Sequence, residues 1–246
     1  YKAELMQKHK AATVTAYIVP VRLFFRWAAQ AGLYPNIAEH IKGATITRDH
    51  KKDALTTRQI KAILQAIDTG ALAGLRDYAL LALMTTCGLR TVEVMRADVG
   101  DIRTAGDSAA LYIQGKGRDS KDEYVKLPAT VETAIRAYLQ ARGKVSASSP
   151  LFASASDRND GERLTTRSIS RIVKGRMRAA GLDSDRLTAH SLRHTAATLN
   201  LLNGGSLEET QQLLRHTNIN TTMIYLHHIS RANNNSESRI ASAIGL

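Results

Sequence analysis

The stretch "LLRHTNINTTMIY", residues 213–225, gives the strongest indication of fold and function in this 246-residue chain. His216 precedes Tyr225 by nine positions, and two further histidines, His227 and His228, follow after Leu226. Three interpretations are open for this stretch. Tyr225 is an ordinary packing residue, the histidines form a metal site, or Tyr225 is a nucleophile. The residues elsewhere in the chain have to distinguish these interpretations.

The charge balance favours a polyanionic partner. The chain has 34 Lys and Arg against 22 Asp and Glu, a net charge of +12, which suits nucleic acid or an anionic membrane. No apolar run approaches the roughly 18–20 residues of a membrane span, so no membrane partner is expected. Aromatic residues make up only 5% and offer few rings for stacking single-stranded bases. We therefore expect duplex DNA, bound through its phosphates.

The single cysteine, Cys87, excludes an internal disulfide and a cysteine-based zinc site. A reducing cytoplasmic setting, with the protein associated with the nucleoid, is the simplest interpretation.

The hydrophobic pattern predicts a small helical block followed by a larger one. Apolar residues recur at helical spacing from Val14 to Ala28 and end at Gly32, with a kink or break expected at Pro20. The polar, basic segment 42–56 has no periodicity and is typical of a linker. Thr56 with Gln59, and Ser206 with Glu209, have the spacing of capping boxes that begin helices.

Helices also account for most of the second block. An apolar helix over 75–86 should stop at Gly88, and further helices should end at Gly143 and Gly181. Only residues 110–128 have a strand pattern, with two short runs around a basic, glycine-rich turn. The predicted fold is mainly α (α+β): a small helical domain and a larger, mostly helical domain with a small antiparallel hairpin.

A metal site at the histidines is disfavoured. His190 and His194 have the i, i+4 spacing of a zinc-binding helix, but no glutamate lies between them and no acidic third ligand is evident. Arg193 would place a cation between the two ligands. On a helix, however, His190 and Arg193 share a face, and an imidazole and a guanidinium together can bind a phosphate. No metal or other cofactor is therefore expected.

Four motifs, in this order along the chain, carry a family resemblance. They are "GLRTVE" at 88–93, "GKGR" at 115–118, "HSLRHT" at 190–195 and the opening stretch at 213–225. Together they resemble the catalytic pattern of tyrosine recombinases, the phage-integrase type that includes Xer proteins and lambda integrase. The spacing of 23 residues from Arg193 to His216, and of nine from His216 to Tyr225, matches that family.

The resemblance implies a role for each residue. Arg90, Arg193 and His216 would hold the scissile phosphate, and Tyr225 would attack it to form a 3′-phosphotyrosine link. His190 would act as general base or as a further donor. Lys116 would be the general acid, with Lys121 as a nearby rival, and Glu93 would support Arg90 or neighbouring cations.

The resemblance also implies a domain organisation and partners. Residues 1–48 would be an N-terminal core-binding domain, shorter than the four-helix domain typical of the family, and 49–55 a linker. Residues 56–229 would be the catalytic domain, and 230–246 a tail that either docks on a neighbouring protomer or frays. The family implies a homotetramer on two synapsed duplexes, a Holliday junction intermediate, and accessory DNA-bending or directionality factors. Arg215 replaces the glycine of the family's "LGH", and a surface or DNA-backbone role is expected for it.

Other functions remain as alternatives. A type IB topoisomerase uses a similar set of residues, and a degenerate relative could bind a DNA site without cleaving it. A metal-dependent rolling-circle nickase would need a histidine–hydrophobic–histidine strand that this chain lacks. The motifs favour the recombinase. They leave open its DNA site and its biological role, whether in phage integration, element transfer, dimer resolution or integron exchange.

Overall fold

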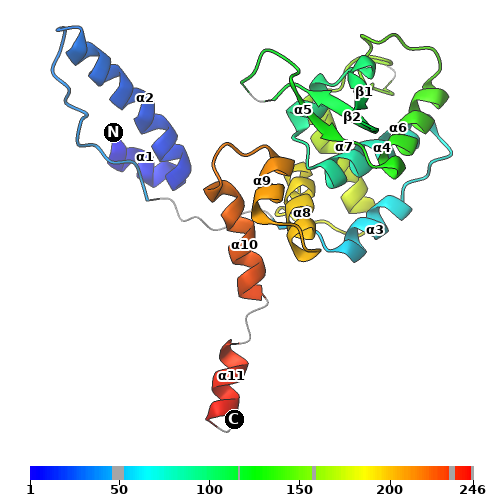
Figure 1. The fold of residues 1–246 in the computed structure, drawn as a ribbon. Helices are drawn as coiled ribbons and strands as arrows, with labels where there is room; N and C mark the ends of the chain where they lie inside the picture. The colour runs from blue at the N-terminus through cyan, green and yellow to red at the C-terminus, as the bar shows by residue number, and fades with distance from the viewer. Residues whose placement is uncertain (46–52, 116, 157–158, 233–235, 245–246) are drawn as a thin grey trace. The chain divides into compact units, whose positions relative to one another are not determined.

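The computed structural model describes residues 1–45, 53–115, 117–156, 159–232 and 236–244 (Figure 1). The chain divides into two compact units, Tyr1–His50 and Lys51–Leu246. Most of the predicted linker 49–55 falls outside the described residues, and so does Lys116. Within those described residues, no helix is long and apolar enough to cross a membrane.

The first unit contains α1 (Lys2–Lys8) and α2 (Ala11–Gln30), which pack against each other. Of the kink or break expected at Pro20, the break does not occur, because α2 continues through this residue. Pro20 and Ala16 are both exposed, so water can solvate the Ala16 carbonyl that loses its helical partner. The segment after the helix returns to α2, where the Thr15 hydroxyl contacts both backbone groups of Ala44, at 3.1 and 3.2 Å.

The second unit is mostly helical, as predicted. Its helices are α3 (Thr57–Gln65), α4 (Leu72–Cys87), α5 (Thr91–Arg96), α6 (Ala129–Arg142), α7 (Thr166–Ala179), α8 (Ala189–Leu202), α9 (Leu207–Leu214), α10 (Asn220–Ala232) and α11 (Ser236–Ala243), with a 3₁₀ turn at Val99–Asp101. The two capping boxes are confirmed. Backbone N–H groups of Gln59 and Glu209 donate to the hydroxyls of Thr56 and Ser206, at 3.2 and 3.0 Å.

The sheet has one strand more than the sequence predicts. The strands β1 (Ile102–Ala105), β2 (Ser108–Ile113) and β3 (Glu123–Lys126) form an antiparallel sheet in that order. Ala105 pairs with Ser108 across a two-residue turn, in which Gly106 has φ 60°. A Gly-Asp dipeptide is a known hairpin signal, but β1 is too short to show a clear alternation.

Helix α4 is the centre of the core because its side chains are buried on most of its faces. It packs against α6 and α8, and the sheet contributes Leu111, Ile113 and Val125 to the same core. Helices α8, α9 and α10 contact one another and lie together on one side of the unit (Figure 1). Leu55 is tied to α8, where its N–H donates to the Thr195 hydroxyl at 2.8 Å.

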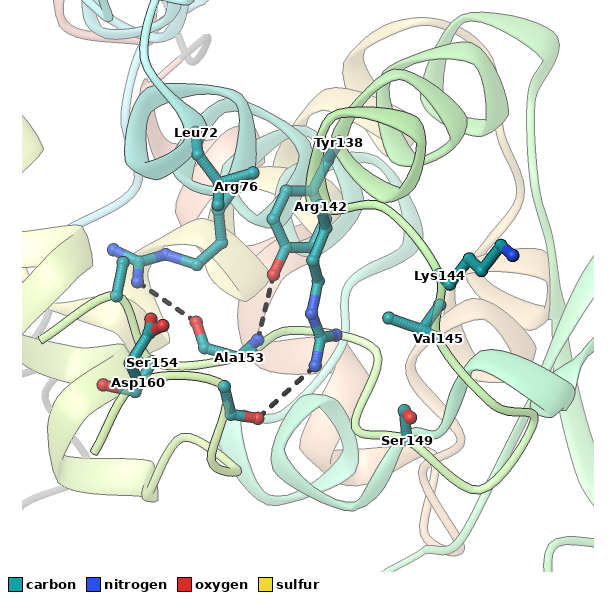
Figure 2. A pocket seen from close by; sticks show the side chains of 12 residues that line it. Leu72, Arg76, Tyr138, Arg142, Lys144, Val145, Ser149, Ala153, Ser154 and Asp160 are labelled. Carbon is teal, nitrogen blue, oxygen red and sulfur yellow. Dashed lines mark hydrogen bonds between the residues drawn. The ribbon is translucent and has the colours of Figure 1, made fainter.

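A cavity of about 300 Å³ lies beside α4 and α6, under the loop after α6 (Figure 2). The Ala153 N–H donates to the Tyr138 hydroxyl at 3.1 Å, and Arg76 donates to the Ala153 carbonyl at 3.1 Å. Arg142 reaches the Gly161 carbonyl at 3.4 Å. The polar groups around this cavity therefore anchor the loop, and its lining includes none of the predicted catalytic residues.

Candidate active site

Three chain segments bring the predicted site residues together. The turn between α4 and α5 carries Arg90, α8 carries His190 and Arg193, and the segment through α9 and α10 carries His216 and Tyr225. Contacts among α4, α8, α9 and α10 hold these segments as one body. Lys116, on the β2–β3 connection, lies outside the described residues, so its predicted role remains a prediction.

Gly88 makes the turn that places Arg90. It ends α4 with φ 59° and ψ 32°, a left-handed conformation that costs glycine nothing. A β-carbon at this position would lie 3.0 Å from Leu214 Cδ2. The Gly88 carbonyl accepts a hydrogen bond from Arg193 Nη1 at 2.5 Å. The glycine therefore allows close packing against α9 and also provides a partner for the second arginine.

Arg193 is almost fully buried, with 1% of its surface exposed. Its Nη2 donates to the Leu214 carbonyl, so the guanidinium links the α4–α5 turn to the end of α9. Burial, followed by the charges of Arg90 and Arg215, lowers the pKa of Arg193 to about 9 against the opposing charges of Glu93 and Tyr225. Such a crowded set of cations would be relieved by a bound anion.

Glu93 organises the first arginine. Its side chain is fully buried, and Oε1 accepts from Arg90 Nη1 at 2.7 Å. Oε2 accepts from the Arg90 backbone N–H at 2.7 Å, which satisfies an unpaired group at the start of α5. Glu93 thus contacts both ends of Arg90, and its supporting role in the chemistry stays a prediction.

Arg215 differs from expectation. Its side chain is only 8% exposed, and Nη2 donates to Glu93 Oε2 at 2.8 Å. A surface role is therefore wrong, because the short turn after α9 directs the guanidinium inward to the buried carboxylate. Arg215 has φ 52° and is the one non-glycine residue with positive φ in the described chain, a conformation that costs on the order of 1 kcal/mol.

Tyr225 is buried, with 6% of its surface exposed, among rings from two helices. Its ring centroid lies 5.1 Å from that of His194, edge-on, and 6.5 Å from that of His216, stacked. Burial raises the pKa of the Tyr225 hydroxyl against the opposing charges of Arg193 and Arg90. In the DNA-free protein the phenol is therefore protonated at neutral pH.

His216 is a neutral group in this site. Burial, together with Arg193, Arg90, Arg215 and His190, lowers its pKa to about 4. Its Nδ1 lies 2.9 Å from the Thr222 hydroxyl, which fixes the plane of the ring. At neutral pH a neutral imidazole offers one donor and one acceptor, so His216 can still donate to a phosphate oxygen.

Two neighbours of Tyr225 and His216 were missed from the sequence. His194 contacts the Tyr225 ring, whereas His190 is exposed and meets His194 edge-on at 4.7 Å between centroids. The i, i+4 spacing of the two histidines indicates either a metal pattern or a pair of solvated or core histidines, and it does not predict a contact between His194 and Tyr225. Thr222, one turn before Tyr225, is fully buried beneath His216, and its sequence carries no distinguishing signal.

The alternatives for Lys121 and for the histidines can now be compared with the structure. Lys121 Nζ contacts Asp98 Oδ2 at 2.6 Å and Asp101 Oδ2 at 2.5 Å, so it anchors the sheet connection to the turn after α5. No group of three or more His, Cys, Asp or Glu side chains within the described ranges is arranged to hold a metal ion.

Comparisons with known proteins agree with this arrangement. The profile of the phage integrase family matches residues 53–231. Tyrosine recombinase XerC of Herpetosiphon aurantiacus is 32% identical over 227 residues, which cover 90% of this chain and 71% of the relative. XerC of Chlamydia trachomatis serovar L2 is 32% identical over 225 residues, 91% of this chain and 69% of that protein.

Solved structures have the same fold. XerH recombinase, in a post-cleavage complex with palindromic difH substrate, superposes with a TM-score of 0.75 at 22% identity and covers 100% of this chain and 70% of its own. A lambda integrase dimer bound to a core site gives a TM-score of 0.68 at 19% identity, over 89% and 77% of the two chains. The mainly helical fold and the resemblance inferred from the motifs are thus confirmed. The chain belongs to the phage integrase family and is a tyrosine-type site-specific DNA recombinase.

Proposed function

We propose that this recombinase cleaves and rejoins duplex DNA through a covalent 3′-phosphotyrosine intermediate formed by Tyr225, without a metal ion or ATP. The observation that carries the proposal is the convergence of a buried tyrosine with His216 and two arginines, which come from three segments of the chain. Among the structural relatives, XerH is bound to difH substrate and a lambda integrase tetramer is bound to a Holliday junction. Double-stranded DNA is accordingly the proposed substrate, and a homotetramer on synapsed sites the proposed assembly.

In the proposed reaction, the Tyr225 oxygen attacks the scissile phosphorus and the bond to the 5′ oxygen breaks. The phenol loses its proton, for which His190 is the proposed acceptor, and the leaving 5′ oxygen takes up a proton from Lys116. Arg90, Arg193 and His216 face the charge that builds on the non-bridging oxygens. The new phosphodiester preserves the energy of the old one. Attack by a 5′ hydroxyl from a second duplex then reverses the step and exchanges strands through a Holliday junction.

The charge balance of the site supports phosphate binding. Three arginines, Arg90, Arg193 and Arg215, surround one carboxylate, Glu93, and leave the centre positively charged. A bound phosphodiester would lower the repulsion between Arg90 and Arg193. Because its negative charge offsets the arginine charges, it would also make ionisation of the Tyr225 hydroxyl less favourable than in the DNA-free site. Deprotonation of the phenol should therefore be coupled to attack rather than precede it.

A nicked suicide duplex tests the proposal, because the cleaved fragment diffuses away. Its 5′ hydroxyl can then no longer reverse the step, and the covalent intermediate accumulates. Wild-type protein should give an adduct that survives denaturation and forms equally well in EDTA. Tyr225→Phe removes only the hydroxyl and should give none, while Tyr138→Phe, at another buried tyrosine, should retain it. An adduct formed by Tyr225→Phe, or a requirement for a divalent metal, would overturn the proposal.

The DNA claim has its own test. If the cationic surface contacts several phosphates, the logarithm of the affinity falls linearly and steeply with the logarithm of salt concentration. Fluorescence anisotropy with a labelled duplex between low and physiological salt measures this slope. A flat salt dependence would contradict phosphate-mediated binding.

A further inference from the structure

Arg215 occupies a position where the backbone favours glycine. It ends α9 with φ 52° and ψ 48°, and its N–H donates to the Gln212 carbonyl at 3.0 Å. The next N–H, of His216, donates to the Gln211 carbonyl at 3.1 Å. This left-handed turn directs the chain toward His216, and glycine would make it without steric cost. The backbone therefore does not explain why an arginine is present.

The side chain is built into the protein rather than left on its surface. Besides Glu93, it contacts the Leu213 carbonyl, to which Nη1 donates at 2.7 Å. Its Nε is buried and has no hydrogen-bond partner in the described part of the chain. A buried guanidinium with an unpaired N–H is unfavourable for packing alone. Its ion pair with Glu93 is the interaction that offsets this cost.

That ion pair acts on Arg90. The Glu93 carboxylate lies between the guanidinium groups of Arg90 and Arg215 and also accepts the Arg90 backbone N–H. If Glu93 took up a proton, it would lose acceptor strength toward both ends of Arg90. Burial raises the pKa of Glu93, and the largest opposing cause is the charge of Arg215, followed by the bonds from Arg90, so that the net pKa is lowered.

We propose that Arg215 is a positioning residue for strand cleavage, which keeps Glu93 ionised and thereby fixes Arg90 for the scissile phosphate. This inference rests on the proposed function, since it assigns Arg90 to the phosphate. Arg215 itself needs no contact with DNA. Arg215 lies directly before His216 in the turn after α9, and through Glu93 it also contacts the side chain that holds Arg90. One residue therefore connects two groups that would donate hydrogen bonds to the scissile phosphate.

Unfolding tests the coupling without DNA. Because the pKa of Glu93 is depressed in the folded protein, its stabilising contribution is present above its ordinary pKa and lost as the pH falls. The Tm of wild type should therefore exceed that of Arg215→Met by more at pH 7.5 than at pH 4.5. Arg215→Lys keeps both the charge and the left-handed strain, so its Tm should lie closer to that of wild type than the Tm of Arg215→Met does. In a Glu93→Gln background, the difference in Tm between Arg215 and Met at this position should no longer change with pH.

Cleavage of the suicide duplex tests the catalytic consequence. Arg215→Met and Arg215→Gly should shift the acidic limb of the single-turnover rate upward by about one pH unit, so that the loss relative to wild type grows as the pH falls and approaches ~10-fold low on that limb. At pH 8.5 they should approach the wild-type rate, and Arg215→Lys should follow wild type throughout. The glycine variant relaxes the backbone, so it remains informative where the methionine variant folds poorly.

Two results would overturn the inference. Unchanged rates in the methionine and glycine variants at every pH would reduce Arg215 to a packing residue. A loss equal at all pH values, not rescued by lysine, would indicate direct contact with the phosphate. If wild type itself formed no adduct, the proposed function would fail, whereas the unfolding comparison would still decide whether Arg215 keeps Glu93 ionised.

Discussion

Substitution of Gly88 by alanine should damage both the stability and the chemistry of this recombinase. Alanine must adopt the left-handed conformation of φ 59°, at a cost of roughly 1–2 kcal/mol. Its β-carbon would also lie 3.0 Å from Leu214 Cδ2 and 3.5 Å from Ala196 Cβ. Crowding of this kind costs about 1–3 kcal/mol, with the lower end expected because a leucine methyl can move. The sum is about 2–4 kcal/mol.

Gly181→Ala is the matched control. Gly181 has φ 76°, and no atom lies within 4 Å of a β-carbon built there, so only the conformational cost of roughly 1–2 kcal/mol applies. Urea unfolding followed by circular dichroism reports mainly the larger helical unit, while the fluorescence of Trp27 reports α2. Gly88→Ala should move the transition seen by circular dichroism to lower urea concentration by more than Gly181→Ala does. The transition seen by Trp27 fluorescence should not move.

The same variant should slow cleavage, because the Gly88 carbonyl holds Arg193 Nη1 at 2.5 Å. A displaced carbonyl releases the guanidinium from its place between α4 and α9, and adduct formation should fall by ~10-fold or more. Gly181→Ala should cleave like wild type. Equal stability losses and equal cleavage rates for the two variants would refute both the crowding argument and the role of Gly88 in holding Arg193.

Three further outcomes are expected. Lys116→Ala should slow cleavage by ~100-fold or more, and a DNA substrate with a 5′-thiol leaving group, which needs no proton donor, should restore the rate. Lys121→Ala, which breaks the contacts with Asp98 and Asp101, should lower stability and show no such rescue. Rescue of the Lys121 variant in place of the Lys116 variant would assign the general acid to Lys121. Burial raises the pKa of the Cys87 thiol to about 12, so a thiol reagent should modify it only in urea, and rapid modification of folded protein would contradict its buried position. The pKa of His216 in the folded protein, about 4, lies below its ordinary value of 6.5, so between these values the unfolded chain binds a proton at this residue that the folded chain does not. The Tm of wild type should therefore fall more between pH 7 and pH 5 than the Tm of His216→Gln. Equal decreases in Tm would argue against the low pKa.

The sequence by itself determined the family, the helical character and the identities of the proposed catalytic residues. Catalysis of this kind requires fixed residue types in a fixed order, so Arg90, His190, Arg193, His216 and Tyr225 could be found from motifs and spacing alone. Capping boxes at Thr56 and Ser206 and the glycine after α4 were likewise visible, because they depend on residues close in the chain. The strand β1 was missed because four residues carry too little pattern.

Only the tertiary structure decided how the site is supported. Arg215 and Glu93 are 122 positions apart, and their ion pair depends on how α8 and α9 pack beside α4 and the turn that leads to α5, which no local pattern encodes. The same reason explains why the sequence predicts a surface or DNA-backbone role for Arg215 and does not place His194 against Tyr225. Local chemistry names the groups that act on a phosphate, whereas long-range packing sets their burial and their charged neighbours. Burial dominates the protonation of His216 and Tyr225, and the arginine charges keep the buried Glu93 ionised.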